Sequence, residues 1–185
     1  MTGYRVPFVD YRKQYRGLKD QLDAAIARTL GDGQLILRED VSTFERDLAA
    51  FVGVREAVGL NSGTDALIFA LRAAGIGRGD EVITVAHTFL ASIAAIVHVG
   101  ATPVLVDVRE DYLMDMDAAA HAVTPRTRAI MPVHLNGRVC DMDRCLELAR
   151  THRLAVIEDD AQALGATFDG RGAGTFGTVS CFSFY

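Results

Sequence analysis

Short apolar runs alternate with amphipathic segments along most of the chain, and this alternation constrains the fold more than any other feature. The runs are rich in β-branched residues, which is typical of strands buried on both faces. Strands separated by helices of roughly ten residues form βαβ units, whose strands lie parallel in one sheet. We therefore predict an α/β fold with a mainly parallel central sheet and helices on both faces. The expected strands are 56–60, 81–86, 103–108, 128–133, 154–158 and 178–184, and the expected helices between them are 64–74, 88–99, 116–122 and 141–152.

Two helices are expected before the first strand. Apolar residues recur every three or four positions from Tyr15 to Leu30, which predicts an amphipathic helix over 11–30. The same spacing follows Asp40, a candidate N-cap of the second helix. At its other end the chain stops inside the apolar run 180–185, where a domain rarely ends. We therefore expect residues 1–185 to be the N-terminal part of a longer protein.

Composition excludes some classes of function. The chain has 185 residues, of which half are hydrophobic, and this is enough for a domain with a core. A net charge of −5 gives no electrostatic footprint for nucleic acid, so no such partner is expected. Cys140, Cys145 and Cys181 are odd in number and lack CxxC spacing, which favours free thiols in a reducing compartment. The N-terminus is too polar for a secretory signal, and we predict a cytoplasmic protein.

One uncharged stretch, 82–106, is long enough to span a bilayer. Gly100 and Pro103 interrupt it, and both of its ends are β-branched. This pattern fits a strand, a helix and a second strand packed inside a protein better than a membrane helix, so no membrane partner is expected.

Three acids, Glu158, Asp159 and Asp160, directly follow the apolar strand 154–157. They would lie at the carboxyl end of a parallel strand, where open α/β sheets bind their ligands. Side chains alternate along an extended chain, so Glu158 and Asp160 would face one way and Asp159 the other. The alternative interpretation is a strand that ends in a solvated acidic turn.

A second candidate is the turn before the helix at 64–74. Gly63 would let the backbone approach an anion at the helix N-terminus, and the Thr64 hydroxyl could add a hydrogen bond. Alternatively, Thr64 or Ser62 only caps the helix. Ser183 could be another phosphate ligand, or a polar residue that alternates with its aromatic neighbours.

Further candidates lie near the ends of the other strands. Phe89 could stack on a planar ligand or cover the sheet as a core residue, and His87 could be a polar group of the site. A carboxylate such as Asp159 would keep a neighbouring pyridine nitrogen protonated, and Gln162 could bond a ring oxygen. The spacing of His134 and the cysteines matches no zinc pattern, and we predict no metal site. The glycine-rich segment 170–174 is interpreted as a turn rather than a dinucleotide loop.

Five motifs together resemble one family. NSGTDAL, GDEVITVAHTF, PVHLNG, VIEDDAQALGA and CFSFY occur in the order and spacing of the DegT/DnrJ/EryC1/StrS sugar aminotransferases. The N-terminal VPFVDYRKQY and GQLIL also resemble this family, so the likeness covers essentially the whole chain. It implies the large domain of a fold type I enzyme dependent on pyridoxal 5'-phosphate, with the C-terminal small domain outside residues 1–185.

The resemblance also implies roles for individual residues. Asp159 would pair with the ring nitrogen, Phe89 would stack on the ring, and Gln162 would contact its phenolic oxygen. The phosphate would be held by Gly63, Thr64, the Asp65 amide and Ser183. The Schiff-base lysine of the family would lie just beyond Tyr185. Residues that could lie on the substrate side are His87, His134 and Asn136.

Three positions depart from the family pattern. Asp160 stands where a small residue is more common, and it could place extra negative charge near the cofactor. Asn136 replaces a common aromatic residue, and Leu164 replaces a common histidine.

The implied activity is transamination of a nucleotide-linked keto-sugar, with glutamate as the amino donor, by a homodimer with shared active sites. A sugar dehydratase of the same family, with histidine in place of the lysine, is one alternative. A nicotinamide-dependent oxidoreductase would instead need a GxGxxG turn after its first strand, and the segment 56–65 has one glycine at its turn. A regulatory binding protein that keeps the fold without the chemistry is the third alternative.

Overall fold

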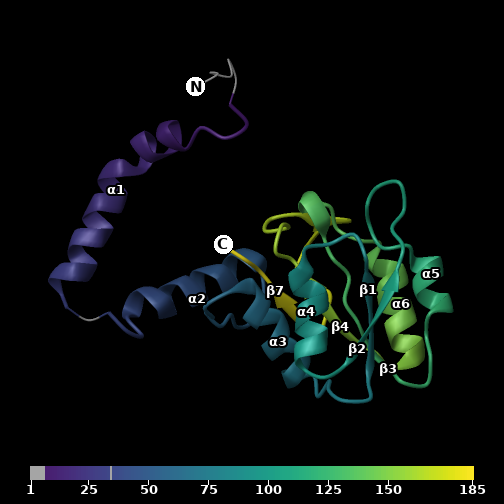
Figure 1. Ribbon diagram of the computed structural model, residues 1–185. Coiled ribbons are helices and arrows are strands. Elements are labelled where there is room, and N and C mark those ends of the chain that lie inside the picture. The colour runs from purple at the N-terminus through teal and green to yellow at the C-terminus, as the bar shows by residue number, and fades with distance from the viewer. Residues whose placement is uncertain (1–6, 34) are drawn as a thin grey trace. The chain divides into compact units, whose positions relative to one another are not determined.

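The computed structural model describes residues 7–33 and 35–185 (Figure 1). The chain divides into two compact units, Met1–Thr43 and Phe44–Tyr185. The first unit contains α1 (Tyr11–Gly31) and the beginning of α2 (Glu39–Val52). The predicted helix 11–30 is thus confirmed. Its apolar stripe, which includes Leu18, Leu22 and Ile26, is exposed in the described structure.

The predicted N-cap at Asp40 is wrong. The helix α2 already begins at Glu39, and Asp40 lies in its first turn. The two oxygens of the Asp40 carboxylate each accept a hydrogen bond at 3.0 Å, one from Arg28 and one from Arg38. The arginines therefore hold the side chain that was expected to cap the helix.

The second unit is built on a five-stranded sheet in the order β2-β1-β3-β4-β7, in which every neighbouring pair is parallel. The apolar runs predicted most of it, with boundaries that shift by a few residues. The strands are β1 (Glu81–Val85), β2 (Thr102–Val106), β3 (Thr127–Ile130), β4 (Ala155–Asp159) and β7 (Val179–Cys181).

Helices cover both faces of this sheet, as predicted (Figure 1). One face packs against α3 (Gly63–Ala73) and α4 (Leu90–His98) through a core that includes Val82 and Ile157. The other packs against α5 (Met116–His121) and α6 (Met142–His152) through a core that includes Ile83 and Val156. Consecutive strand residues thus serve opposite cores, as the pleat requires.

The strand predicted at 56–60 does not form. No residue of this segment joins a β-ladder in the described structure, although the Gly59 amide donates to Glu45 Oε1 at 2.7 Å. Val58 is 77% exposed, so its apolar side chain is not buried against a neighbour. A strand needs a partner for its backbone groups, and local apolar character cannot supply one.

Two smaller predictions concern loops. Segment 170–174 contributes to a hairpin of β5 (Thr167–Phe168) and β6 (Arg171–Gly172), joined by a turn in which Asp169 and Gly170 have positive φ. The turn interpretation is confirmed. The uncharged stretch 82–106 divides into β1, α4 and β2, and no helix among the described residues has the length and apolarity to cross a membrane. A short 3₁₀ turn, η1 (Leu135–Gly137), follows β3.

Candidate active site

The carboxyl ends of the parallel strands carry most of the predicted site residues. The loop after β1 contains His87 and Phe89, and the loop after β3 contains His134 and Asn136. Asp159 ends β4 and lies directly beside Cys181 of β7 in the register. Ser183 follows two residues later, and two residues of extended chain span about 7 Å. The register therefore places Ser183 and Asp159 near the same end of two neighbouring strands.

Asp159 is the buried acid on the α4 side of the sheet. Its Oδ2 accepts a hydrogen bond from Ser92 Oγ at 2.7 Å, and its Oδ1 accepts one from the Ala161 amide at 3.3 Å. Burial raises the pKa of Asp159, and these two bonds oppose the rise. Among the described residues this carboxylate forms no ion pair with a cation, so its ionised form is suited to a protonated nitrogen on a ligand.

Glu158 and Asp160 face away from Asp159, as the alternation predicted, but they are buried rather than solvated. The Glu158 carboxylate accepts hydrogen bonds from the amides of Gly174, Phe176 and Gly177 at 2.6–3.1 Å and from His134. Burial would raise the pKa of Glu158, but His134 and the amides outweigh it and the pKa is lowered. This carboxylate is a structural anchor, and the alternative of a solvated acidic turn is wrong.

His134 is fully buried, so its prediction as a substrate-side residue is wrong. Its Nδ1 accepts from the Cys140 amide at 3.2 Å, and its Nε2 lies 3.3 Å from Glu158 Oε2. Because Nδ1 is an acceptor, the ring proton is on Nε2 and is donated to Glu158. The alternation of side chains holds only within a strand. The sequence therefore could not show which way the His134 side chain points in the loop after β3.

Asp160 is the unusual residue of the three. Neither of its carboxylate oxygens has a hydrogen-bond partner in the described structure, and the residue is 1% exposed. Burial, followed by the charges of Glu158 and Asp159, raises the pKa of Asp160 to about 9. The raised pKa favours the protonated acid at neutral pH, and therefore less negative charge near the cofactor than the sequence suggested.

His134, Glu158 and Asp160 offer ligand atoms within 4.8 Å of one another, a spacing that could suit a cation. The hydrogen bonds of His134 argue against a cation here. Its Nδ1 accepts from the backbone amide of Cys140, and its Nε2 carries the ring proton. A metal would need the lone pair on Nε2. The hydrogen bonds therefore favour a cluster without a metal ion.

The N-terminus of α3 packs directly against the exit of β7. A Cβ built on Gly63 would lie 2.8 Å from Ser183 Cβ and 3.1 Å from Ser183 Oγ, so only glycine permits this approach. Ser62 is the N-cap, and its Oγ accepts from the Asp65 amide at 3.1 Å. The capping interpretation is thus confirmed for Ser62, and the Asp65 amide assigned to the phosphate is used by the cap. The amides of Gly63 and Thr64 have no acceptor among the described residues.

The aromatic and amide candidates are accessible. Phe89 is 74% exposed at the start of α4, so the alternative of a core residue is wrong. His87 is exposed and lies against Tyr112, with ring centroids 5.6 Å apart. Gln162 Oε1 accepts a hydrogen bond from the backbone amide of Asn136 at 2.9 Å, which brings two predicted residues together. The amide nitrogen of Gln162 remains available as a donor.

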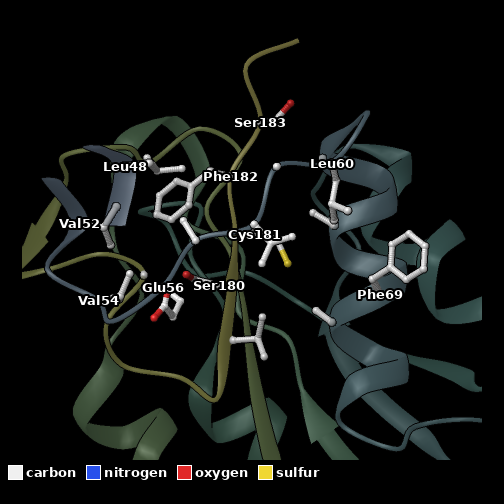
Figure 2. A pocket seen from close by; sticks show the side chains of 18 of the residues that line it. Leu48, Val52, Val54, Glu56, Leu60, Phe69, Ser180, Cys181, Phe182 and Ser183 are labelled. Carbon is white, nitrogen blue, oxygen red and sulfur yellow. The ribbon is translucent and has the colours of Figure 1, made fainter. Parts of the chain in front are cut away.

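A hollow of about 710 Å³ borders the phosphate-side residues (Figure 2). Leu48, Val52 and Val54 form one wall, with Leu60 and Phe69 opposite. Gly63 and Ser183 are among its lining residues, whereas Phe89, Asp159 and Gln162 are not. This apolar groove is therefore adjacent to the candidate site rather than identical with it.

These residues fit pyridoxal 5'-phosphate. Free amides at a helix N-terminus and the hydroxyl of Ser183 suit a phosphate, and the glycine contact leaves no room for a side chain there. The buried carboxylate of Asp159 suits the protonated pyridine nitrogen, and the exposed ring of Phe89 suits its face.

Comparison with known proteins decides the family. The model of the DegT/DnrJ/EryC1/StrS aminotransferase family matches residues 17–185. The chain belongs to this family. The match favours aminotransferase chemistry over the nicotinamide-dependent oxidoreductase considered above.

Individual DegT/DnrJ/EryC1/StrS proteins are similar over nearly the whole chain. The dTDP-3-amino-3,4,6-trideoxy-alpha-D-glucose transaminase of Streptomyces venezuelae is 49% identical over 182 residues, which is 98% of this chain and 48% of that protein. The crystal structure of S. venezuelae DesV with a ketimine intermediate superposes with a TM-score of 0.95 at 48% identity, over 99% of this chain and 50% of DesV.

A further similar structure is a PLP form. The PLP form of Spr1654 from Streptococcus pneumoniae, described as a sugar aminotransferase, has a TM-score of 0.83 at 36% identity, over 86% of this chain and 45% of Spr1654. The chain spans about half the length of each of these proteins.

Sequence reasoning missed Ser92 and the anchoring role of Glu158. Ser92 lies four residues after Thr88 in an expected helix, but its partner Asp159 is 67 positions away. Only the order of the strands in the sheet brings the two together.

Proposed function

We propose that this chain is the N-terminal half of a pyridoxal 5'-phosphate-dependent aminotransferase that converts a nucleotide-linked keto-sugar into an amino-sugar. Glutamate is the proposed amino donor, and the enzyme is proposed to act in the cytoplasm as a homodimer with shared active sites. The similarity to the Streptomyces transaminase supports the substrate class.

The observation that carries the proposal is the placement of two complementary groups at one edge of the sheet. Gly63 and Ser183 form a phosphate cradle at the start of α3, and Asp159 presents a buried carboxylate beside the same strand exit. One end of this arrangement suits a dianion and the other a ring cation, which is the charge pattern of the cofactor.

Each residue has a separate task in this proposal. The Gly63 and Thr64 amides and the Ser183 hydroxyl bind the phosphate, and Phe89 orients the ring plane. Asp159 holds a proton at the pyridine nitrogen, and Gln162 donates to the phenolic oxygen. The cofactor, when bound, supplies an electron sink for the carbanion left by proton removal. A lysine just beyond Tyr185 would move that proton.

The decisive test is Asp159→Asn in the full-length protein. The wild type should show a visible absorption band with pyridoxal 5'-phosphate that glutamate bleaches, and mass spectrometry should detect an amino-sugar product. Replacing Asp159 should lower turnover by at least about a hundredfold while the circular dichroism spectrum is unchanged, because the ring nitrogen loses its charge partner. Near-normal turnover would remove Asp159 from this role.

The residue at the position of the expected lysine and the same assays separate the alternatives. Histidine in place of the expected lysine, with loss of a hydroxyl rather than gain of an amine, would identify the dehydratase. No absorption band and no affinity for the cofactor would indicate a binding protein that keeps the fold.

A further inference from the structure

A chain of two hydroxyl groups, one partly exposed and one buried, leads to Asp159 from the start of α4. Ser92 lies in the first turn of α4 with no exposed surface, and its Oγ is 2.7 Å from Asp159 Oδ2. Thr88 Oγ1 lies 2.8 Å from the same Ser92 oxygen. Both hydroxyl groups stand on the face of the sheet that carries Asp159.

The direction of these hydrogen bonds follows from the charge on Asp159. An ionised carboxylate only accepts, so Ser92 must donate its single hydroxyl proton to it. Toward Thr88 the Ser92 oxygen can then only accept, so Thr88 must donate. The carbonyl of Phe89 competes for the Ser92 proton at 3.4 Å, a longer and weaker contact. The chain therefore runs one way, from Thr88 through Ser92 to the carboxylate.

This arrangement favours one charge state of Asp159. A hydrogen bond donated to a carboxylate stabilises its ionised form, whereas burial favours the neutral acid. Ser92 provides the strongest of the contacts that oppose burial, ahead of the Ala161 amide at 3.3 Å. On this face Cys181 lies beside Asp159 in the sheet, and burial raises the pKa of its thiol, while Glu158, Asp160 and His134 are the charged or titratable groups on the other side of β4. Among the described residues, Ser92 and the Ala161 amide donate to Asp159.

We propose that Ser92, supported by Thr88, is a positioning residue that keeps the Asp159 carboxylate ionised and oriented toward the pyridine nitrogen of the cofactor. The inference rests on the proposed function, since it concerns the same cofactor. A carboxylate has about four acceptor sites, and the two hydrogen bonds to protein groups leave capacity for a ring N–H.

The test measures the affinity of the full-length apoprotein for pyridoxal 5'-phosphate as a function of pH. Ser92→Ala should weaken binding on the order of tenfold or more, because it removes a hydrogen bond to a charged group. The acid limb of the affinity profile should move up by about one pH unit, since the ionised form of Asp159 loses stabilisation. Thr88→Val should cause a smaller change in the same direction, and Ser92→Thr, which keeps the hydroxyl, should restore affinity.

Thr84→Val is the matched control. Thr84 is also fully buried, and its hydroxyl donates to the Met131 carbonyl at 3.0 Å rather than to Asp159. Its removal should leave both affinity and the pH profile unchanged. If Ser92→Ala does not fold, the comparison of Thr88→Val with Thr84→Val decides the question.

The outcomes separate this inference from the proposed function. If Asp159→Asn loses the cofactor while Ser92→Ala binds it with wild-type affinity and an unmoved pH profile, Ser92 has no positioning role. Equal losses in Ser92→Ala and Thr84→Val would also overturn it, because the effect would then be structural. If Asp159→Asn itself binds normally and turns over normally, Asp159 has no role at the ring nitrogen and the inference falls with it, whereas the proposed function is judged by the absorption band and the amino-sugar product.

Discussion

At the scale of single residues, the chain places three neighbouring carboxyl groups in three different states. Asp159 faces the candidate site, Glu158 accepts from three backbone amides and a histidine, and Asp160 has no hydrogen-bond partner among the described residues. Alternation along one strand separates the first from the other two, and the environment of each side chain decides its charge.

Asp160 predicts a pH-dependent loss of stability. Its pKa rises from 3.8 to about 9 in the folded chain, so its contribution to stability is present below the lower value and is lost as pH rises through the upper one. At pH values between 3.8 and about 9, the free energy of unfolding of Asp160→Asn should rise relative to wild type by up to about 1.4 kcal/mol per pH unit. Urea unfolding at several pH values measures this difference. The exposed-site control Asp47→Asn should show no such trend, and a constant offset for Asp160→Asn would contradict the prediction.

At the scale of elements, α3 and the chain that leaves β7 approach so closely that a side chain at Gly63 would clash with Ser183. The helix starts on a glycine whose neighbour across the junction is Ser183. The closeness brings the helix N-terminus, with its positive end, to the strand that also flanks Asp159.

Gly63→Ala should therefore weaken cofactor binding more than it alters folding. The added methyl group would meet Ser183 Cβ at 2.8 Å, and one side of the junction would have to move, at a cost of about 1–3 kcal/mol. Titration of the full-length apoprotein with pyridoxal 5'-phosphate would measure the loss. Gly17→Ala in α1 is the control, since no atom lies within 4 Å of that site, and it should leave affinity unchanged and stabilise the helix by up to about 1 kcal/mol. Unchanged affinity in Gly63→Ala would place the phosphate elsewhere.

At the scale of the whole molecule, the sheet brings together groups that are distant in sequence. Five parallel strands align the loops after β1, β3, β4 and β7 at one edge, and helices on both faces bury the strands. A ligand that binds several of these loops binds the folded state only, and so adds to stability.

Pyridoxal 5'-phosphate should accordingly raise the stability of the full-length protein. At a concentration a hundred times its Kd the expected gain is about 2.7 kcal/mol, and calorimetry would record it as a higher Tm. Pyridoxal without the phosphate should give a much smaller gain, because the amides of Gly63 and Thr64 would have no anion to bind. Equal gains from both compounds would show that the phosphate contributes nothing.

Sequence reasoning succeeded where a property is local. The strands at 81–86 and 154–158 were recognisable because burial on both faces leaves a continuous apolar run, and Asp159 was recognisable by its place after such a run. The failures depend on distant partners. The segment 56–60 has strand-like composition but no neighbouring strand among the described residues, and Ser92 acquires its role only when β1 and β4 lie on either side of β3.

The hydrogen bonds from residues 174–177 to Glu158 have a mechanical consequence. Its carboxylate ties the backbone of residues 174–177, which leads into β7, to β4 on the side of the sheet opposite the candidate site. β4, which ends at Asp159, and the segment that leads through β7 to Ser183 are thus joined by these hydrogen bonds as well as by the sheet. A displacement that keeps these hydrogen bonds would move both anchors together.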